Sequence, residues 1–346
     1  MQFGTCFVGD LFCGPGKNGT EKGSPLLLIE IAKRVLDNVH LKKKHPNCHI
    51  TILFNDQNKN FLDSLEKETS KLEIDEQRIK FFVRNLSFKE IITSEIINIL
   101  RNKAIPKFFF LDPFNYSTIQ LDELKTLIKL PFTEVLLFSP TFLAYRFKEV
   151  AGKHAKLKNF LDNFTAKGEA NYKDVYDFID SICIRLKGEL NTELIRQIPI
   201  DFGRTKHTLF FITKHIMGML IINSIFLKES FDGRSLCVKE IKNNQIKPPL
   251  FSKTQLETRE FIKRMKEYQG SLEEYLKKEK KLTNKEIIYH SIACGWLPKY
   301  ACELVRKLKS EGKVEYGYLV NGMKKGPYVS NQNWNKELCV VSYKKV

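Results

Sequence analysis

The sequence predicts an α/β protein built on a doubly wound parallel sheet, and two observations lead to this prediction. Within the first 140 residues, short apolar segments bounded by Asn, Asp, Pro or Gly alternate with segments of helical periodicity. Such short apolar segments are typical of strands that are buried in a parallel sheet. Strand–helix–strand alternation also implies right-handed crossovers, which place helices on both faces of the sheet.

Five apolar segments are expected to form the strands, at 4–12, 49–54, 79–83, 107–111 and 134–138. Helices are expected between the first four of them, at 24–41, 61–72 and 88–102. In the first helix, apolar residues recur at helical spacing: Leu27, Leu28, Ile31, Val35 and Leu36.

Residues 142–195 interrupt this alternation. They are helical in pattern and rich in lysine, including Lys148, Lys153, Lys156 and Lys158, and they predict a helical insertion that caps the sheet. Residues 198–202 and 208–213 are expected to pair as closing strands, and a buried helix is expected at 214–227. Polar residues interrupt the apolar stretch here, so it does not predict a membrane span.

A second, smaller domain is expected after a linker at 232–254 that contains Gly, Asn and Pro. Helices are expected at 261–278, 284–294 and 298–310, followed by a strand at 314–320 and a turn at Asn321-Gly322. This order predicts a winged helix. The expected division is therefore an α/β domain over 1–231, the linker, and a winged-helix domain over 255–346.

The charge of the chain points to a polyanionic partner. The 346 residues include 42% hydrophobic residues, as in a globular protein, and carry a formal net charge of +17. Nucleic acid is the first candidate and an anionic membrane surface the second. The alternative is the lysine-rich composition that AT-biased genomes give to proteins of every kind.

The cysteines predict no metal site, because none of the eight shows Cys-x-x-Cys spacing or a zinc-finger pattern with histidine. Most lie in apolar segments, which indicates buried thiols and a reducing compartment. Together with the absence of a charged segment and cleavage site within residues 1–12, this predicts a cytoplasmic protein.

The segment from Asp10 to Gly16 predicts a ligand site at the end of the first strand. Gly14 and Gly16 let the backbone approach a ligand closely, and Pro15 stiffens the turn. The segment lacks the Gly-x-x-x-x-Gly-Lys-Ser/Thr pattern of a phosphate-binding loop, which disfavours hydrolysis of ATP, and a mononucleoside is the expected ligand. The alternative is a tight strand-to-helix turn.

Polar residues also follow the second and third strands. Asn55 and Asp56 are placed to hold the hydroxyls of a ribose, and Asn85 is placed to pair with the edge of an adenine. Asp is also a common helix cap at this position, which is the structural alternative.

Leu111-Asp112-Pro113-Phe114 is the best catalytic candidate. An exocyclic amine of a base is a poor nucleophile because its lone pair is delocalised into the ring. Asp112 and a backbone carbonyl held by Pro113 can accept the amine hydrogens, while Phe114 can stack on an extruded base. The alternative is a strand that ends in a proline turn, with Phe114 in the core.

Taken together, these motifs resemble the three-Cys-motif partner proteins. That family has the pattern Asp-hydrophobic-Phe-small-Gly-Pro-Gly, then Gly-Ser-Pro, then Leu-Asp-Pro-Phe, matched here by Asp10–Gly16, Gly23–Pro25 and Leu111–Phe114. The resemblance continues through Leu137-Phe-Ser-Pro140, Thr213-Lys-His215 and the expected winged helix.

The resemblance implies a class I S-adenosylmethionine-dependent methyltransferase fold. It also implies a separate partner protein with a three-cysteine, radical-type iron–sulfur motif, and a more distant similarity to adenine-N6 methyltransferases. The implied cofactor contacts are Asp10, Phe12, Gly14, Pro15, Gly16, Ser24, Asn55, Asp56 and Asn85.

Two departures from these patterns affect the interpretation. The adenine-N6 enzymes have Asp/Asn-Pro-Pro-Tyr/Phe, whereas the second Pro is absent here, so the amine-methylation motif is incomplete. The family often has a helical segment before the first strand, and this chain begins almost at the strand.

Basic residues are expected to bind nucleic-acid phosphates in the second domain. The helix at 298–310 would be the recognition helix and the following hairpin the wing. The residues concerned are Lys299, Arg306, Lys307, Lys309, Lys324 and Lys325. A winged helix that contacts protein is the alternative.

Three hypotheses follow for the function. The first is a nucleic-acid base methyltransferase, with adenine N6 as the expected target. The second is a non-catalytic adaptor that keeps the fold, binds nucleic acid and recruits the iron–sulfur partner. The third is a methyltransferase for protein or small molecules, which the basic charge disfavours.

Overall fold

The computed structural model describes residues 4–115, 118–166, 172–201, 206–230, 236–237, 241–242, 245–246, 253–319 and 335–344. The chain divides into two compact units. The first comprises Met1–Gln197 and Thr205–Lys214, and the second comprises Ile198–Arg204 and His215–Val346. Each unit is described by itself.

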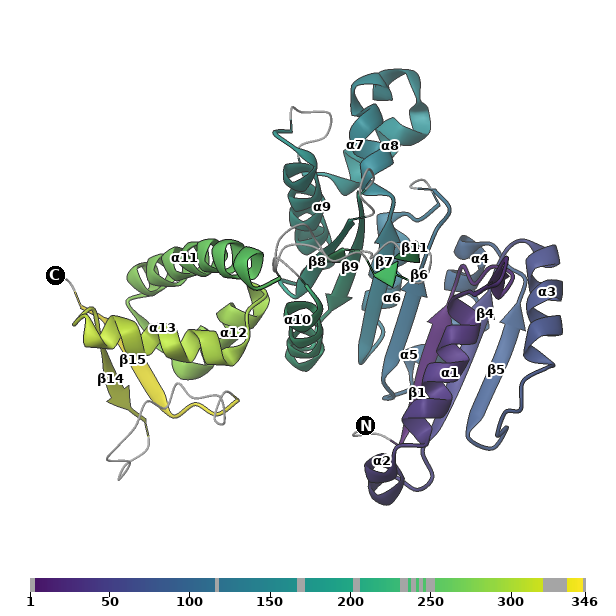
Figure 1. Cartoon of the computed structure of the whole chain (residues 1–346), viewed down its shortest axis with the longest axis horizontal. Coiled ribbons are helices and arrows are strands. Elements are labelled where there is room, and N and C mark those ends of the chain that lie inside the picture. The colour runs from purple at the N-terminus through teal and green to yellow at the C-terminus, as the bar shows by residue number, and fades with distance from the viewer. Residues whose placement is uncertain are drawn as a thin grey trace. The chain divides into compact units, whose positions relative to one another are not determined.

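The first unit is built on a mostly parallel sheet, in which the strands lie in the spatial order β8-β9-β7-β6-β1-β4-β5 (Figure 1). Only the first three residues of β8 belong to this unit, and β10 belongs to the second unit. Neighbours from β5 to β7 are parallel, and β9 runs antiparallel to β7. The bounds are β1 (Thr5–Asp10), β4 (His49–Asn55), β5 (Ile79–Arg84), β6 (Lys107–Leu111), β7 (Thr133–Ser139), β8 (Ile195–Asp201), β9 (Lys206–Thr213) and β10 (Leu236–Cys237). This mixed α/β architecture confirms the predicted fold class and is consistent with a Rossmann-like methyltransferase fold.

Helices cover the sheet on two sides because successive strand residues point to opposite faces. Ile50, Ile52 and Phe54 of β4 pack in one core with α1 (Ser24–Leu36) and α3 (Lys59–Thr69). Leu53, which lies between Ile52 and Phe54 in sequence, packs in the core on the other face of the sheet. That core also takes residues from α4 (Phe88–Thr93), α5 (Glu95–Arg101), α6 (Leu121–Ile128) and α9 (Val175–Leu190).

The predicted helical insertion forms α7 (Thr141–Phe147), a 3-10 helix η1 (Lys148–Lys153), α8 (Ala155–Phe164) and α9. Its inner residues Ala144, Leu157 and Phe160 belong to the same core as β6 and β7. The insertion is therefore an integral layer of the first unit.

Two predicted helices are each broken in two. The helix expected at 24–41 stops at Leu36, and a second helix, α2 (Val39–Lys44), begins after Asn38, whose side chain accepts hydrogen bonds from two amides of its first turn. The helix expected at 88–102 is interrupted at Ser94, which has an extended backbone. The first strand also ends at Asp10 and not at residue 12.

The second unit combines helices with a small antiparallel sheet. Its helices are α10 (Ile216–Glu229), α11 (Lys253–Glu279), α12 (Asn284–Ala293) and α13 (Pro298–Ser310). The strands β13 (Lys281–Thr283), β14 (Val314–Tyr318) and β15 (Cys339–Tyr343) form a sheet in the order β13-β15-β14, and β11 (Ile241–Lys242) pairs with β12 (Gln245–Ile246). The predicted turn at Asn321-Gly322 lies outside the described residues.

A buried polar contact joins α10 to the rest of the second unit. Asn223 is fully buried, and its Nδ2 donates to the carbonyl oxygen of Ile292 at 2.8 Å. No helix among the described residues combines the length and hydropathy needed to cross a bilayer.

Candidate active site

Acidic residues lie at or directly after the ends of three neighbouring strands. Asp10, the last residue of β1, is paired in register with Phe54 of β4 and Phe110 of β6. Asp56 and Asp112 follow those two strands directly. Both raise the pKa of Asp10 electrostatically, so the three carboxyls form one cluster. Strand order reverses around β1, and ligands of open α/β sheets bind at such a point.

The carboxyl group of Asp10 is the most strongly perturbed of the three. Its side chain is 0% exposed, and Oδ2 accepts a hydrogen bond of 2.6 Å from the Ser24 hydroxyl at the start of α1. The other oxygen, Oδ1, has no hydrogen-bond partner among the described residues, and the backbone amide of Phe12 lowers the pKa of the carboxyl group. Burial dominates and raises the pKa of Asp10 to about 7. A buried carboxyl oxygen without a donor fits a positively charged ligand group.

The glycine turn lies beside Asp10 and has the strained backbone that glycine permits. Gly14 and Gly16 have φ angles of 63° and 81°. A Cβ atom on Gly14 would meet nothing within 4 Å, whereas one on Gly16 would lie 2.9 Å from the Leu65 side chain. Gly14 thus leaves open space, as a ligand cradle requires, while Gly16 is needed for packing against α3. Pro15 between them is half-buried.

A short hairpin separates the glycine turn from the helix that follows. The strands β2 (Lys17–Asn18) and β3 (Glu21–Lys22) are exposed and pair antiparallel. Gly23 closes the hairpin by donating its amide hydrogen to the carbonyl oxygen of Gly16 at 2.7 Å. A Cβ atom on Gly23 would lie 3.0 Å from that oxygen, so no larger residue fits without a shift.

Asp56 holds the glycine turn in place. Its Oδ2 accepts from the Gly14 amide at 3.0 Å, and its Oδ1 accepts from the Asn58 amide at 2.8 Å, just before α3. The alternative for Asp56, a structural role at the start of the following helix, is therefore observed in part. Asn85, which is exposed, donates to the Asp56 carbonyl oxygen at 2.8 Å. The contacts of Asp56 with a ribose and of Asn85 with an adenine stay predictions.

Asn55 is a structural link between strand ends. It is 1% exposed, and Nδ2 donates to the carbonyl oxygens of Leu11 and Leu86 at 3.3 and 3.0 Å. Its Oδ1 accepts from the Leu86 amide at 3.2 Å. These three bonds tie β4 to the segments after β1 and β5, and they occupy the amide that was predicted to hold a ligand.

The Asp112-Pro113-Phe114 turn has one buried and two exposed residues. Asp112 is exposed as a residue, but the protein around its carboxyl group raises the pKa of that group. Pro113 is buried. Phe114 is 73% exposed, which excludes the alternative that its ring fills the core. The ring centroid lies 6.2 Å from that of Phe61 on α3.

The Phe61–Phe114 pair was not predicted. Phe61 follows β4 and Phe114 follows β6, and these two strands flank β1. Two rings that are 53 residues apart in sequence can only be paired once the strand order is known. The pair places aromatic surface at the carboxyl edge of the sheet, beside the glycine turn.

Two further residues of the first loop are packed in the cores. The Phe12 ring contacts the Phe88 ring with centroids 5.1 Å apart. Cys13 is buried, and burial together with Asp10 and Asp56 raises the pKa of its thiol well above the ordinary value. A thiol in this state is a poor nucleophile, in agreement with its prediction as a packed residue.

The predicted phosphate-binding residues lie on α13 as far as the structure describes them. Lys299, Arg306, Lys307 and Lys309 are all exposed. Lys309 Nζ lies 4.0 Å from the centroid of the Tyr316 ring, and Lys307 lies 3.9 Å from Glu311. Lys324 and Lys325 lie outside the described residues. Binding of nucleic acid by this helix stays a prediction.

The solved structures that align with part of this chain include a methyltransferase domain and a putative dehydrogenase. The methyltransferase domain of bacterial CtHen1 aligns with 15% identity and a TM-score of 0.31, over 59% of this chain and 88% of that one. A putative zinc-dependent alcohol dehydrogenase from Rhodobacter sphaeroides aligns with 9% identity and a TM-score of 0.27, over 61% and 84%. No protein-family model and no curated protein matches the sequence. The strand order of the first unit alone makes its sheet consistent with a Rossmann-like methyltransferase fold.

Proposed function

We propose that this protein is an S-adenosylmethionine-dependent methyltransferase that acts on an exocyclic amine of a nucleic-acid base, with adenine N6 as the target. The observation that carries the proposal is the carboxyl cluster at the ends of β4, β1 and β6. Asp10, in its centre, is buried and has a carboxyl oxygen without a donor. Such a group costs free energy unless a positive charge neutralises it.

The residues present fit this cofactor. S-adenosylmethionine carries an ammonium group and a methyl group on a positively charged sulfur, and it supplies that methyl group as the electrophile. Asp10 would neutralise one of the positive charges, and the open space at Gly14 would admit the nucleoside. Ser24 would keep Asp10 oriented through its 2.6 Å hydrogen bond.

The Asp112 turn would hold the target amine. Asp112 would accept one amine hydrogen through its carboxylate, and the Pro113 carbonyl would accept the other, which localises the lone pair on nitrogen. The exposed Phe114 ring is available to stack on a base that has been extruded from its helix. These roles need an ionised Asp112, so activity is expected to rise with pH through the raised pKa of its carboxyl.

Two features support nucleic acid as the substrate class. The chain carries a net charge of +17. The second unit has the order α11, β13, α12, α13, β14, β15, with a three-stranded antiparallel sheet, which supports a winged helix that presents α13. The resemblance described above adds a radical-type iron–sulfur partner to the proposal.

The test has two stages. Isothermal titration should show binding of S-adenosylmethionine and of its demethylated product; absence of both would refute the proposal. Transfer of a labelled methyl group to adenine-containing oligonucleotides should then fall about 100-fold or more in Asp112→Ala, with cofactor binding retained. Asp122→Ala, an exposed carboxylate on α6, is the matched control and should leave the rate unchanged.

A second candidate is the non-catalytic adaptor. The full internal use of the Asn55 amide favours it, as does the missing second Pro after Asp112. An adaptor would bind nucleic acid and the iron–sulfur partner without transferring a methyl group. Activity of the complete system that is unaffected by Asp112→Ala would support this candidate and contradict the catalytic one.

A further inference from the structure

We propose that the outer surface of the helical insertion binds a single strand of nucleic acid beside Asp112. This surface, called the cap surface below, consists of the exposed residues of α7, η1 and α8. The inference deepens the proposed function, because it names the part of the chain that would hold the substrate strand. It differs from the predicted phosphate contacts, which all lie on the second unit.

The cap is joined directly to the Asp112 turn. Residues from both lie around one small pocket at the carboxyl ends of β6 and β7: Pro113 from the turn, Ser139 and Pro140 from the end of β7, and Phe160 and Phe164 from α8. The rings of Phe160 and Phe164 stack with centroids 5.1 Å apart. A strand bound to the cap would therefore lie at the catalytic edge of the sheet.

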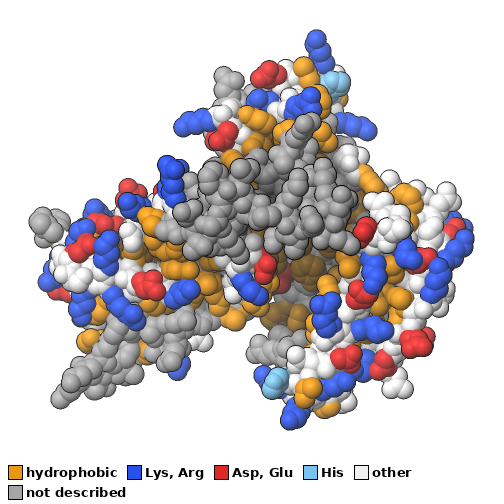
Figure 2. Space-filling view, viewed as in Figure 1, with side chains coloured by type: hydrophobic (Ala, Val, Ile, Leu, Met, Phe, Trp, Pro, Cys, Tyr) orange, Lys and Arg blue, Asp and Glu red, His pale blue; other side chains and the backbone are white. Residues whose placement is uncertain are grey.

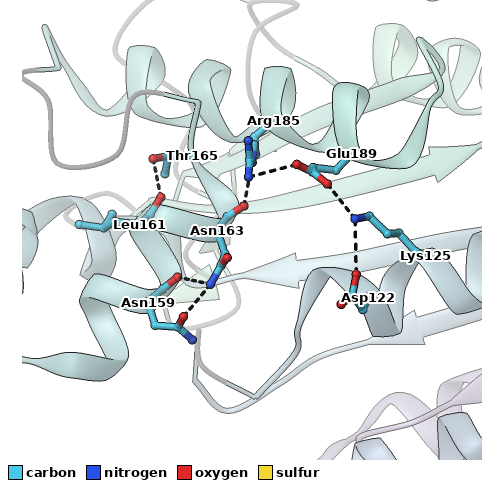
Figure 3. A network of polar contacts seen from close by, with 8 residues as sticks. All are labelled: Asp122, Lys125, Asn159, Leu161, Asn163, Thr165, Arg185 and Glu189. Atoms are coloured by element: carbon cyan, nitrogen blue, oxygen red, sulfur yellow. Dashed lines mark hydrogen bonds and ion pairs between the residues drawn. The ribbon is translucent and has the colours of Figure 1, made fainter.

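A polar network fixes the cap to the body of the first unit (Figure 3). Arg185 of α9 donates to the Asn163 carbonyl oxygen at 3.1 Å and pairs with Glu189 at 3.0 Å. Glu189 in turn pairs with Lys125 of α6 at 2.7 Å. Within the insertion, α9 thus holds the end of α8, and Glu189 of α9 joins the insertion to α6.

The cap surface exposes an apolar row. Leu143, Phe147 and Val150 are 44%, 47% and 40% exposed. Leu143 and Phe147 are four residues apart and lie on one side of α7, and Val150 follows on η1. Their neighbours Ala144 and Ala151 are buried in the core. Phe114 adds a second exposed ring at the adjoining turn. Exposed rings provide stacking platforms for bases only where the bases are unpaired, which favours a single strand over a duplex.

Cations flank this row. Residues 141–164 carry five Lys and Arg against two Asp and Glu. The Arg146 guanidinium lies 5.6 Å from the centroid of the Phe147 ring. Within the part of the chain that the structure describes, Lys153, Lys156 and Lys158 form no ion pair and are exposed. Figure 2 shows Lys and Arg side chains projecting around hydrophobic ones on this part of the molecule, at the top of the view. Two exposed rings, Phe147 and Phe114, with exposed cations on the same surface match the bases and phosphates of one strand.

The test is binding of the full chain to a fluorescein-labelled single-stranded 20-mer, measured by anisotropy between 50 and 200 mM salt. Combined Lys153→Glu, Lys156→Glu and Lys158→Glu should lower the slope of log K against log salt by about 2, since each lost phosphate contact on a single strand contributes about 0.7. Phe147→Ala should weaken binding about tenfold without changing that slope.

The matched control is Lys42→Glu, Lys43→Glu and Lys44→Glu on α2, which makes the same change of charge outside the cap. An equal loss of affinity in this control would overturn the proposal, because net charge alone would then explain binding. Tight binding to duplex that the cap variant does not weaken would also overturn it. So would a cap variant that loses binding to phosphatidylserine vesicles but keeps binding to the 20-mer.

Cofactor titration of the same variants separates this inference from the proposed function. The cap variants are expected to bind S-adenosylmethionine as the unmodified chain does, since their changes avoid the carboxyl cluster. A chain that binds the 20-mer through the cap but binds no cofactor would refute the methyltransferase and leave the cap surface standing. A chain that binds the cofactor, but whose binding of the 20-mer does not depend on the cap residues, would refute the cap surface alone.

Discussion

Asp10→Asn is expected to make the protein more stable at pH 8 while it weakens binding of a cationic cofactor. The substitution keeps the shape of the side chain, and the amide oxygen can still accept the 2.6 Å hydrogen bond from Ser24. It removes the ionisation of a side chain that is 0% exposed. The folded state then no longer has to hold a charge away from water.

The size of the effect follows from the pKa of Asp10, which is raised from 3.8 to about 7. The folded state holds this proton more firmly than the unfolded state does. The free energy of unfolding therefore falls as pH rises from about 4 to about 7, and the loss is complete above that range. Raising the pKa of Asp10 from 3.8 to about 7 corresponds to about 4 kcal/mol of unfolding free energy lost by pH 8, at about 1.4 kcal/mol for each pH unit.

Thermal unfolding at pH 4 and pH 8 measures this difference. The unmodified protein and Asp10→Asn should melt at similar temperatures at pH 4. At pH 8, Asp10→Asn should melt about 10 °C higher than the unmodified protein. Asp63→Asn, at an exposed position on α3, is the control and should show no such change. A variant that is less stable than the unmodified protein at pH 8, or that keeps its pH dependence between 4 and 7, would refute the reasoning.

Three more substitutions have expected outcomes. Asn55→Ala breaks three hydrogen bonds of a buried side chain and should lower the free energy of unfolding in urea by about 3 kcal/mol; a loss below about 1 kcal/mol would contradict its structural role. The ammonium group of Lys107 donates to three backbone carbonyl oxygens at 2.6–2.9 Å, and Lys107→Met removes that donor. The free energy of unfolding in urea should fall by about 3 kcal/mol. Gly16→Ala forces a Cβ atom to 2.9 Å from Leu65 at a φ of 81°, and should lower stability by about 2 kcal/mol and weaken cofactor binding. Unchanged melting and titration curves would show that this turn tolerates a side chain.

The sheet could be predicted because its signals are local. Each of the five expected strands, now β1, β4, β5, β6 and β7, is a short apolar segment next to a polar residue or a proline, and each is present within a few residues of its expected bounds. The short strands β2 and β3 were not predicted. The helix break at Asn38 also had a local signal, since Asn is a favoured N-cap. The apolar residues on both sides of it concealed that signal.

The contacts within the site could not be predicted, because they join residues far apart in sequence. Asp56 reaches back 42 positions to the Gly14 amide, and that bond makes it part of the turn's support. Phe61 and Phe114 meet only because β4 and β6 lie on either side of β1. Residue type and position at a strand end indicated that Asp10 mattered, but its missing hydrogen-bond donor is a property of the packed structure.

The contact between Gly16 and Gly23 has a consequence for how such chains are found and altered. Read along the chain, Gly14, Gly16 and Gly19 have the Gly-x-Gly-x-x-Gly spacing, and Gly23 lies four residues further on. In three dimensions the intervening hairpin begins and ends at one hydrogen bond of 2.7 Å, so Gly23 returns to the side of Gly16. A motif search that matches Gly19 therefore selects a residue between the two exposed strands of the hairpin, whereas the glycine that packs beside the turn is Gly23. For an engineer, the same position offers a place where residues 17–22 can be shortened or replaced by a tag.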